Sequence, residues 1–364
     1  MNINEIIGVL NEWAPSAYQE SYDNARLITG DPNETLTGVL VTLDCTEEVV
    51  QEAIDLKANL IVAHHPIVFK GLKSFTGKNY VERTVIKAIK NDIAIFSIHT
   101  NLDHVLTGVN SMICSKLGLD NCRILAPKSE VLSKLVTFVP TDRAEAVLDS
   151  LYQSGMGKIG NYDQCSFQIM GTGTFRPNDK ANPTLGQARV KESVEEVRIE
   201  GIFPTHRKSK IVGTLKKSHP YEEVAYYLTA LENENQEVGA GMVGQLSEPM
   251  STQDFFTMVK KQFNLSVIRH TNFHTDKIKK VAVCGGAGSF LLGAARGVGA
   301  DVFITGDFKY HEFFDAEQKI IIADIGHYES EVFTKELICN FLKEKFANIA
   351  LNLSEVDTNP IKYF

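Results

Sequence analysis

The chain has 364 residues, of which 43% are apolar and 23% are charged, and its formal net charge is −8. This ordinary composition predicts a normal core in about two or three domains, and the acidic balance disfavours a nucleic-acid-binding protein. No run of 18 apolar residues exists, which excludes a membrane-spanning helix. The N-terminus has no basic and apolar leader, which excludes a secretory signal. The six cysteines contain no C-x-x-C motif, so reduced thiols of a cytoplasmic protein are predicted.

The first third of the chain alternates between helical and strand patterns. Helices are predicted at residues 3–13, after the capping residue Thr46, and at residues 80–91. Apolar runs predict strands at residues 38–43, 59–63 and 93–98. Strands that alternate with helices at this spacing indicate a mostly parallel sheet that is covered on both faces.

The pattern changes near Pro127 and returns to regular alternation from Gly239. Within this segment, strands are predicted near residues 134–140, 164–171 and 195–203, and helices at about 142–153 and 221–234. The β-α-β-β-α-like order is typical of a small α+β unit of roughly 100 residues. The segment is therefore predicted to be a separate insert domain.

The last third resumes the α/β pattern. Strands are predicted at residues 281–284, 301–305 and 320–324, and the final helix at about 329–346. The glycine-rich residues 285–289 match neither a Walker A motif nor the Rossmann spacing, so a tight strand-to-helix turn is favoured over a phosphate cradle. We predict a discontinuous α/β domain of residues 1–128 and 238–364 that residues 129–237 interrupt.

Four of the predicted strands are followed by clusters of histidine and carboxylate residues. These clusters are His64-His65-Pro66, His99 to His104 with Asp103 between them, Asp307 with His311, and His327 with Glu331. Each cluster alone is common on a surface loop or helix. Together they lie where open α/β sheets build their sites, at the carboxyl ends of strands. Their coincidence predicts one shared site.

The spacing within two clusters suits metal ligation. His327 and Glu331 are four residues apart and share a helix face, so both can reach one ion. Asp307 and His311 repeat this spacing and could be outer-shell or substrate-facing groups. Nitrogen and carboxylate ligands without thiolate favour Zn, Mn, Fe or Co. A carboxylate shared between histidines on two sides suits a pair of ions about 3.5–4 Å apart.

The four clusters, in this order along nearly the whole chain, resemble the GTP cyclohydrolase 1 type 2 homologs, also called NGG-interacting-factor-three-like proteins. The resemblance implies a dinuclear metal centre, bridged by Glu331, with the ligands His64, His65, Asp103, His327 and Glu331. Residues 157–162 and 218–226 resemble the insert of longer members, which is similar to ferredoxin-like PII and CutA-type domains. The resemblance also implies a toroidal homohexamer whose metal sites face an internal cavity.

The function implied is that of a metal-dependent hydrolase with a nucleotide or related small molecule as its ligand. For GTP, metal-bound hydroxide would attack C8 of the purine and a second hydrolysis would release formate, whereas phosphoester hydrolysis on the same two ions stays open. His99 and His311 are the predicted proton shuttles. The alternative is a non-catalytic protein that assembles as a ring and serves in metal binding, ligand sensing or regulation.

Overall fold

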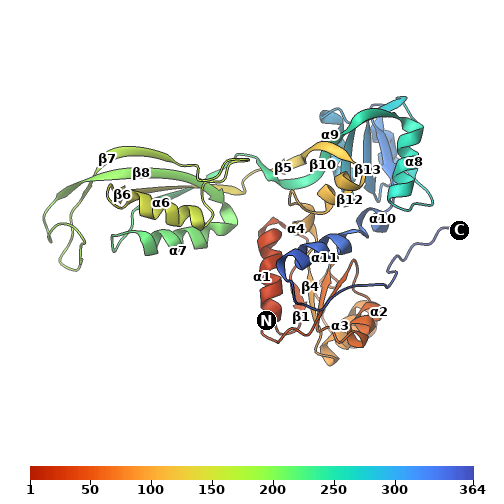
Figure 1. Ribbon diagram of the computed structural model, residues 1–364, viewed down its shortest axis with the longest axis horizontal. Coiled ribbons are helices and arrows are strands. Elements are labelled where there is room, and N and C mark those ends of the chain that lie inside the picture. Colours follow the sequence, from red (N-terminus) through yellow and green to blue (C-terminus); the bar gives the residue numbers. More distant parts are fainter. The chain divides into compact units, whose positions relative to one another are not determined.

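The computed structural model describes residues 1–364, and the chain divides into two compact units (Figure 1). The first unit combines Met1–Ala126 with Glu237–Phe364, and the second is Pro127–Gln236. None of the helices combines the length and the hydropathy that a membrane span requires. The mixed α/β class predicted from the sequence is confirmed, since each unit joins helices to one or more sheets.

The first sheet of the first unit has five strands in the order β1-β4-β3-β2-β15. They are β1 (Leu27–Thr29), β2 (Val39–Thr42), β3 (Leu60–Ala63), β4 (Ala94–Ser97) and β15 (Leu351–Leu353). Only β1 runs antiparallel to its neighbour. Every residue of β2, β3 and β4 is buried, as the short Val/Ile/Leu-rich runs predict for strands covered on both faces.

Several helices accompany this sheet, and the three longest begin at side-chain caps. The helices are α1 (Ile3–Trp13), η1 (Ser16–Tyr18), α2 (Glu47–Asp55), α3 (Tyr80–Lys90), α4 (Thr100–Asp103) and α5 (Val109–Lys116). The side chains of Thr46 and Asn79 accept from backbone N–H groups in the first turns of α2 and α3. Such caps satisfy donors that have no partner within the helix. They therefore hold the loops that precede α2 and α3 in place.

The second sheet of the first unit has six strands in the order β11-β14-β13-β12-β10-β5. They are β5 (Leu119–Lys128), β10 (Asn235–Ser251), β11 (Arg269–His270), β12 (Lys277–Ala287), β13 (Val302–Gly306) and β14 (Ile321–Asp324). The strands β12, β13 and β14 are parallel, whereas β10 and β11 run antiparallel to their neighbours β12 and β14. The sheets are therefore mixed, because antiparallel strands flank a parallel centre in place of a uniformly parallel arrangement.

The helices of the second half are mostly short. They are α8 (Thr252–Gln262), η3 (Ser289–Leu291), α9 (Leu292–Gly297), η4 (Tyr310–Ala316), α10 (His327–Glu331) and α11 (Thr334–Lys345). The single final helix predicted at residues 329–346 is wrong, because α10 and α11 are separate helices. The split leaves His327 and Glu331 on a helix of their own that directly follows β14.

The second unit has one antiparallel sheet in the order β7-β8-β6-β9, and α6 and α7 lie on one of its faces (Figure 1). Its elements are β6 (Leu132–Pro140), α6 (Ala144–Gln153), β7 (Phe167–Phe175), β8 (Glu192–Pro204), η2 (Thr205–Arg207), α7 (Lys208–Ser218) and β9 (Tyr226–Leu231). The order β-α-β-β-α-β is that of split βαβ folds.

One element of this unit differs from its prediction. Residues 221–234, predicted to be a helix, contain the strand β9 instead. Val224, Tyr226 and Leu228 pack against the core at a spacing of two residues, and β9 pairs with β6. Pairing with an existing sheet outweighed the local helical pattern.

Candidate metal centre

Polar segments from both sheets of the first unit meet at the carboxyl ends of parallel strands. His64 and His65 follow β3, and His99 follows β4. On the other sheet, Asp307 follows β13, and α10 follows β14 and begins at His327. Open α/β sheets place ligand sites at this end of their strands.

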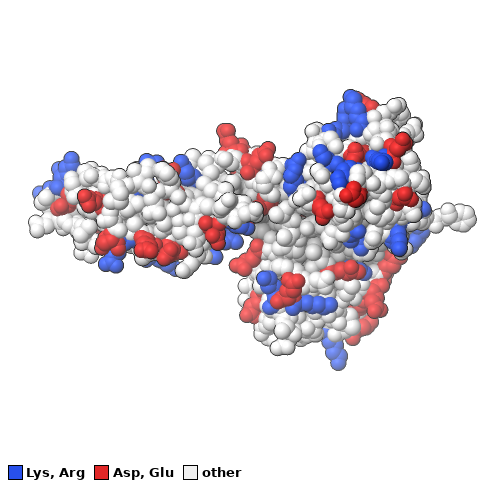
Figure 2. All heavy atoms as spheres, turned by 45° about the horizontal axis from the view of Figure 1, so that its top comes forward, with Lys and Arg blue, Asp and Glu red and all other residues white.

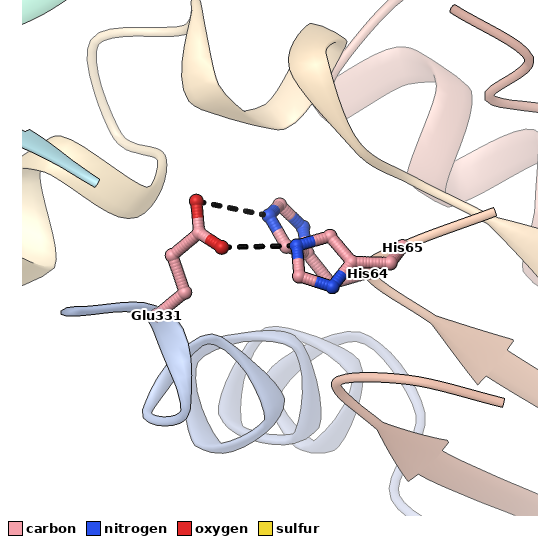
Figure 3. Close-up of side chains that lie close together, drawn as sticks. All are labelled: His64, His65 and Glu331. Carbon is pink, nitrogen blue, oxygen red and sulfur yellow. Dashed lines mark hydrogen bonds and ion pairs between the residues drawn. The ribbon is translucent and has the colours of Figure 1, made fainter. Parts of the chain in front are cut away.

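The buried carboxylate of Glu331 is the central group of this cluster. Its Oε2 lies 2.9 Å from His65 Nε2 and 3.1 Å from His327 Nε2. Its Oε1 lies 3.9 Å from His64 Nε2. Figure 3 shows the imidazoles of His64 and His65 pointing at the carboxylate from the opposite side. The two oxygens of one carboxylate therefore face different histidines.

Two buried atoms of the cluster have no hydrogen-bond partner. They are His64 Nε2 and Asp103 Oδ1, which lie 3.5 Å apart. Buried polar atoms without partners are rare because desolvation is not compensated. The ligand atoms of His64, His65 and Glu331 lie within 4.8 Å of one another. A nitrogen- and oxygen-liganded divalent cation therefore fits the residues present.

Each histidine of the cluster is oriented through its Nδ1 atom. This atom donates a hydrogen bond of 2.7–2.8 Å in all four cases. The acceptors are the Ile98 carbonyl for His64, Asp44 for His65, Asp23 for His99 and Asp307 for His327. Such outer partners fix the ring orientation and the tautomer of metal-binding histidines. They leave Nε2 as the ligating or proton-transferring atom.

The histidines and carboxylates of the site shift one another's pKa values. Burial alone would lower the pKa of His65 and His327, but the hydrogen bonds that these rings donate to neighbouring carboxylates, and the negative charge of those carboxylates, raise the pKa values to about 9 and about 11. Burial works against ionisation of Glu331, yet the histidines hold its pKa well below the usual range. Burial and the charge of Glu331 raise the pKa of Asp103 to about 7. A bound cation would take the place of these protons.

A cavity of about 580 Å³ opens onto the cluster, with His65, Asp103, His327 and Glu331 in its wall. His99 and the aromatic rings of Tyr22, Phe69 and Phe290 also line it. His311 lies elsewhere: it is exposed on η4, where its ring contacts those of Tyr310 and Phe314. The structure therefore brings His99, but not His311, to the cavity.

The predicted set did not include two carboxylates that orient histidines of the site. Asp23 accepts from His99 and also from the Thr100 hydroxyl at 2.5 Å. Although burial opposes ionisation, these hydrogen bonds lower the pKa of Asp23 to about 2. Asp23 belongs to an irregular segment without a motif, so no sequence signal marks it. Asp44 follows β2, and its place at a strand end could have identified it.

The tight turn predicted at residues 285–289 is only partly correct, because residues 285–287 form the end of β12, where its pairing with β13 shifts register. Gly286 has a φ of 62°, which favours glycine. Its N–H donates to Ser330 Oγ on α10, and its carbonyl accepts from Thr305 Oγ1 on β13. These two hydrogen bonds tie the end of β12 to β13 and to the helix that carries Glu331.

We expect Asp307→Asn to weaken metal binding by roughly 10–100-fold, the usual cost of losing an outer-shell partner. The amide no longer draws the Nδ1 proton of His327 as a carboxylate does, so the ring loses its fixed tautomer and part of its basicity. Calorimetric titration of chelator-treated protein with Zn²⁺ measures the change. Asp315→Asn, an exposed position on η4, is the matched control. Equal affinity of Asp307→Asn and wild type would contradict the orienting role.

The fold and the site together define a mixed α/β protein with a candidate histidine-carboxylate metal site. The family model for Duf34/NIF3 (NGG1p interacting factor 3) matches residues 1–360. Proteins named GTP cyclohydrolase 1 type 2 homolog are 40% identical in Halalkalibacterium halodurans and 37% in Staphylococcus epidermidis, with at least 99% of each chain covered. A Bacillus cereus crystal structure described as related to NIF3 superimposes with a TM-score of 0.89 at 39% identity, covering 100% of this chain and 99% of that one. The chain belongs to the Duf34/NIF3 family.

Proposed function

We propose that the protein is a metal-dependent hydrolase that acts on a nucleotide or a related small molecule. Two divalent cations would be held by Glu331 between them and by His64, His65, Asp103 and His327. The observation that carries the proposal is the arrangement around Glu331, with one oxygen toward His64 and the other toward His65 and His327. The buried atoms His64 Nε2 and Asp103 Oδ1 have no hydrogen-bond partner, which supports a metal-ligand role for both residues.

When bound, such cations polarise a substrate oxygen and lower the pKa of water. The donor set of imidazole and carboxylate suits Zn, Mn, Fe or Co. The chain's own contribution is orientation, because Asp44 and Asp307 hold the imidazoles that face Glu331.

His99 is the proposed proton-transfer residue. Its ring lines the cavity, and Asp23 accepts from its Nδ1 atom. This hydrogen bond leaves Nε2 to exchange a proton with a molecule in the cavity. Asp23 therefore acts as a positioning residue. His311 has no comparable place at the cavity, so the proposal assigns the transfer to His99 alone.

The substrate class rests on size and charge. The cavity of about 580 Å³ is of small-molecule size. On the face shown in Figure 2, basic and acidic side chains are interspersed, whereas a nucleic-acid footprint gathers basic ones. The name of the relatives makes ring opening of GTP the first reaction to test, and phosphoester hydrolysis is the second.

The assembly and the insert are parts of the same proposal. We infer a cytoplasmic homohexamer, and a PII-like role for the second unit, from the resemblance in sequence. The β-α-β-β-α-β order of that unit is compatible with this assignment. Light scattering on the full chain would measure the mass of the assembly.

The hydrolase proposal predicts turnover that depends on the site. Chelator-treated protein reloaded separately with Zn²⁺, Mn²⁺, Fe²⁺ or Co²⁺ would be assayed against GTP and a panel of phosphoesters. We expect at least one ion to support turnover in wild type and none to do so in His64→Ala, because His64 Nε2 has no other partner. His270→Ala, at an exposed histidine of β11, should behave as wild type. Metal-loaded wild type with no turnover above that of His64→Ala would instead indicate a non-catalytic metal-binding protein.

A further inference from the structure

A second cavity of about 810 Å³ opens beside the candidate metal centre. It shares His65, Pro66 and Phe69 with the metal-side cavity, so the two are adjacent across one wall. Its other walls are the loop of residues 67–79, the start of α3 and the C-terminal residues Thr358 and Pro360. None of the catalytic roles proposed above uses this space.

The two cavities differ in the charge of their walls. The carboxylates of Glu20, Asp103 and Glu331 line the metal side. Three exposed lysines, Lys70, Lys73 and Lys78, line the other cavity. A wall of lysines attracts anions, whereas a wall of carboxylates attracts cations.

The two acidic residues of the lysine-lined cavity are already engaged by the protein. Asp44 accepts from His65 Nδ1 and from the Thr358 hydroxyl. Glu82 accepts from the backbone N–H groups of Thr76 and Lys78 and from the Thr76 hydroxyl. The ammonium of Lys78 lies 3.6 Å from Glu82 Oε1, and no carboxylate pairs with Lys70 or Lys73. Positive charge therefore exceeds what the local acids neutralise.

Phe69 supplies an apolar surface where the two cavities meet. Its ring is 46% exposed. It lies 6.2 Å from the ring of Tyr22 and 6.1 Å from that of His99, measured between centroids. An exposed aromatic ring between an anion-attracting and a cation-attracting wall can stack on a planar ring system.

We propose that the lysine-lined cavity binds the phosphate groups of a small phosphorylated ligand whose remainder reaches the metal-side cavity. The ammonium groups of Lys70, Lys73 and Lys78 would donate charge-assisted hydrogen bonds to the phosphate oxygens. This inference rests on the proposed hydrolase function and narrows its substrate to a phosphorylated compound. It assigns the loop of residues 67–79 to substrate binding.

The test measures phosphate binding without metal. GTP, guanosine and inorganic tripolyphosphate would be titrated calorimetrically into the full-length, chelator-treated protein, so that metal-phosphate coordination does not contribute. We expect wild type to bind GTP and tripolyphosphate with an affinity that falls as salt rises. The triple variant Lys70→Ala, Lys73→Ala, Lys78→Ala should bind both about tenfold or more weakly, with the affinity for guanosine unchanged.

Two control variants separate a local site from a general charge effect. Lys90→Ala, Lys261→Ala, Lys277→Ala removes the same charge from exposed positions outside the cavity and should bind as wild type. Replacing the three cavity lysines by arginine should retain binding, because the positive charge stays. No tripolyphosphate binding to wild type, or the same loss in both alanine variants, would overturn the inference. Tighter lysine-dependent binding of a single-stranded DNA dodecamer than of GTP would overturn the small-molecule ligand.

A phosphate site and a hydrolase activity give different readouts on the same protein. Metal content and turnover would be measured on the same preparations. Lysine-dependent tripolyphosphate binding without turnover in any metal form supports the phosphate site and overturns the hydrolase. Turnover of GTP with an unchanged KM in the lysine-to-alanine variant supports the hydrolase and overturns the phosphate site.

Discussion

Glu331→Gln is expected to lose its bound metal. The carboxylate is buried and lies within 4 Å of the Nε2 atoms of three histidines, so its charge is the one that these rings share. Glutamine keeps the shape of the side chain, but its amide is neutral and has one oxygen. The two carboxylate oxygens of Glu331 share a negative charge and face different histidines. We expect metal affinity to fall by more than the roughly 10–100-fold that follows loss of an outer-shell partner. Metal analysis after dialysis, together with calorimetric titration, measures the loss.

A matched control addresses the change in charge. Glu336→Gln removes the same charge from an exposed position in the first turn of α11 and should retain wild-type metal content. Circular dichroism would establish that Glu331→Gln is folded. A folded Glu331→Gln protein that binds as much Zn²⁺ as wild type, and as tightly, would refute a central role for this carboxylate.

Gly286→Ala is expected to disrupt the same site from the opposite side. A Cβ atom at this position would lie 2.5 Å from Glu331 Oε1 and 3.2 Å from His327 Cε1. The backbone adds a second cost, because its φ of 62° is rarely adopted by residues with a side chain. Since Gly286 N–H also donates to Ser330, movement of this end of β12 would shift α10. We expect a loss of metal affinity of at least about tenfold, together with a lower melting temperature.

Gly293→Ala provides the comparison. Gly293 lies in α9 with nothing within 4 Å of the added Cβ, so alanine should be neutral or stabilise the helix by up to about 1 kcal/mol. Thermal unfolding and Zn²⁺ titration of both variants separate a general glycine effect from a local clash. Normal metal affinity in Gly286→Ala would show that the end of β12 does not constrain Glu331 and His327.

The local signals in the sequence were strongest for the elements that carry the site. The apolar runs before His64, His99 and Asp307 are strands, as predicted. The i, i+4 spacing of His327 and Glu331 corresponds to the short helix α10. Of the five residues predicted as metal ligands, Glu331 is the central carboxylate and the other four lie around it, although their role as ligands stays a prediction. Periodicity and strand-end position depend on neighbouring residues, which is why they can be recognised without a fold.

Other features depend on contacts between distant segments. Residues 221–234 have a helical pattern, but pairing with β6 makes part of this segment a strand. Asp23 reaches His99 across 76 positions of sequence, and no motif marks it. His311 shares the i, i+4 spacing with Asp307, yet it faces Tyr310 and Phe314 on the surface. Asp307 lies before η4 with a φ of 58°, so the two residues do not share a helix and their spacing does not bring them to one face.

The sequence by itself determined the family, the mixed α/β class and the four histidine-carboxylate clusters. Only the tertiary structure decided how the clusters meet, because His65 and Glu331 lie 266 positions apart and approach through the packing of two sheets. The same packing placed the two oxygens of Glu331 toward different histidines and set a lysine-lined cavity beside them. Local patterns specify elements, whereas the free energy of burying distant segments against one another specifies the site.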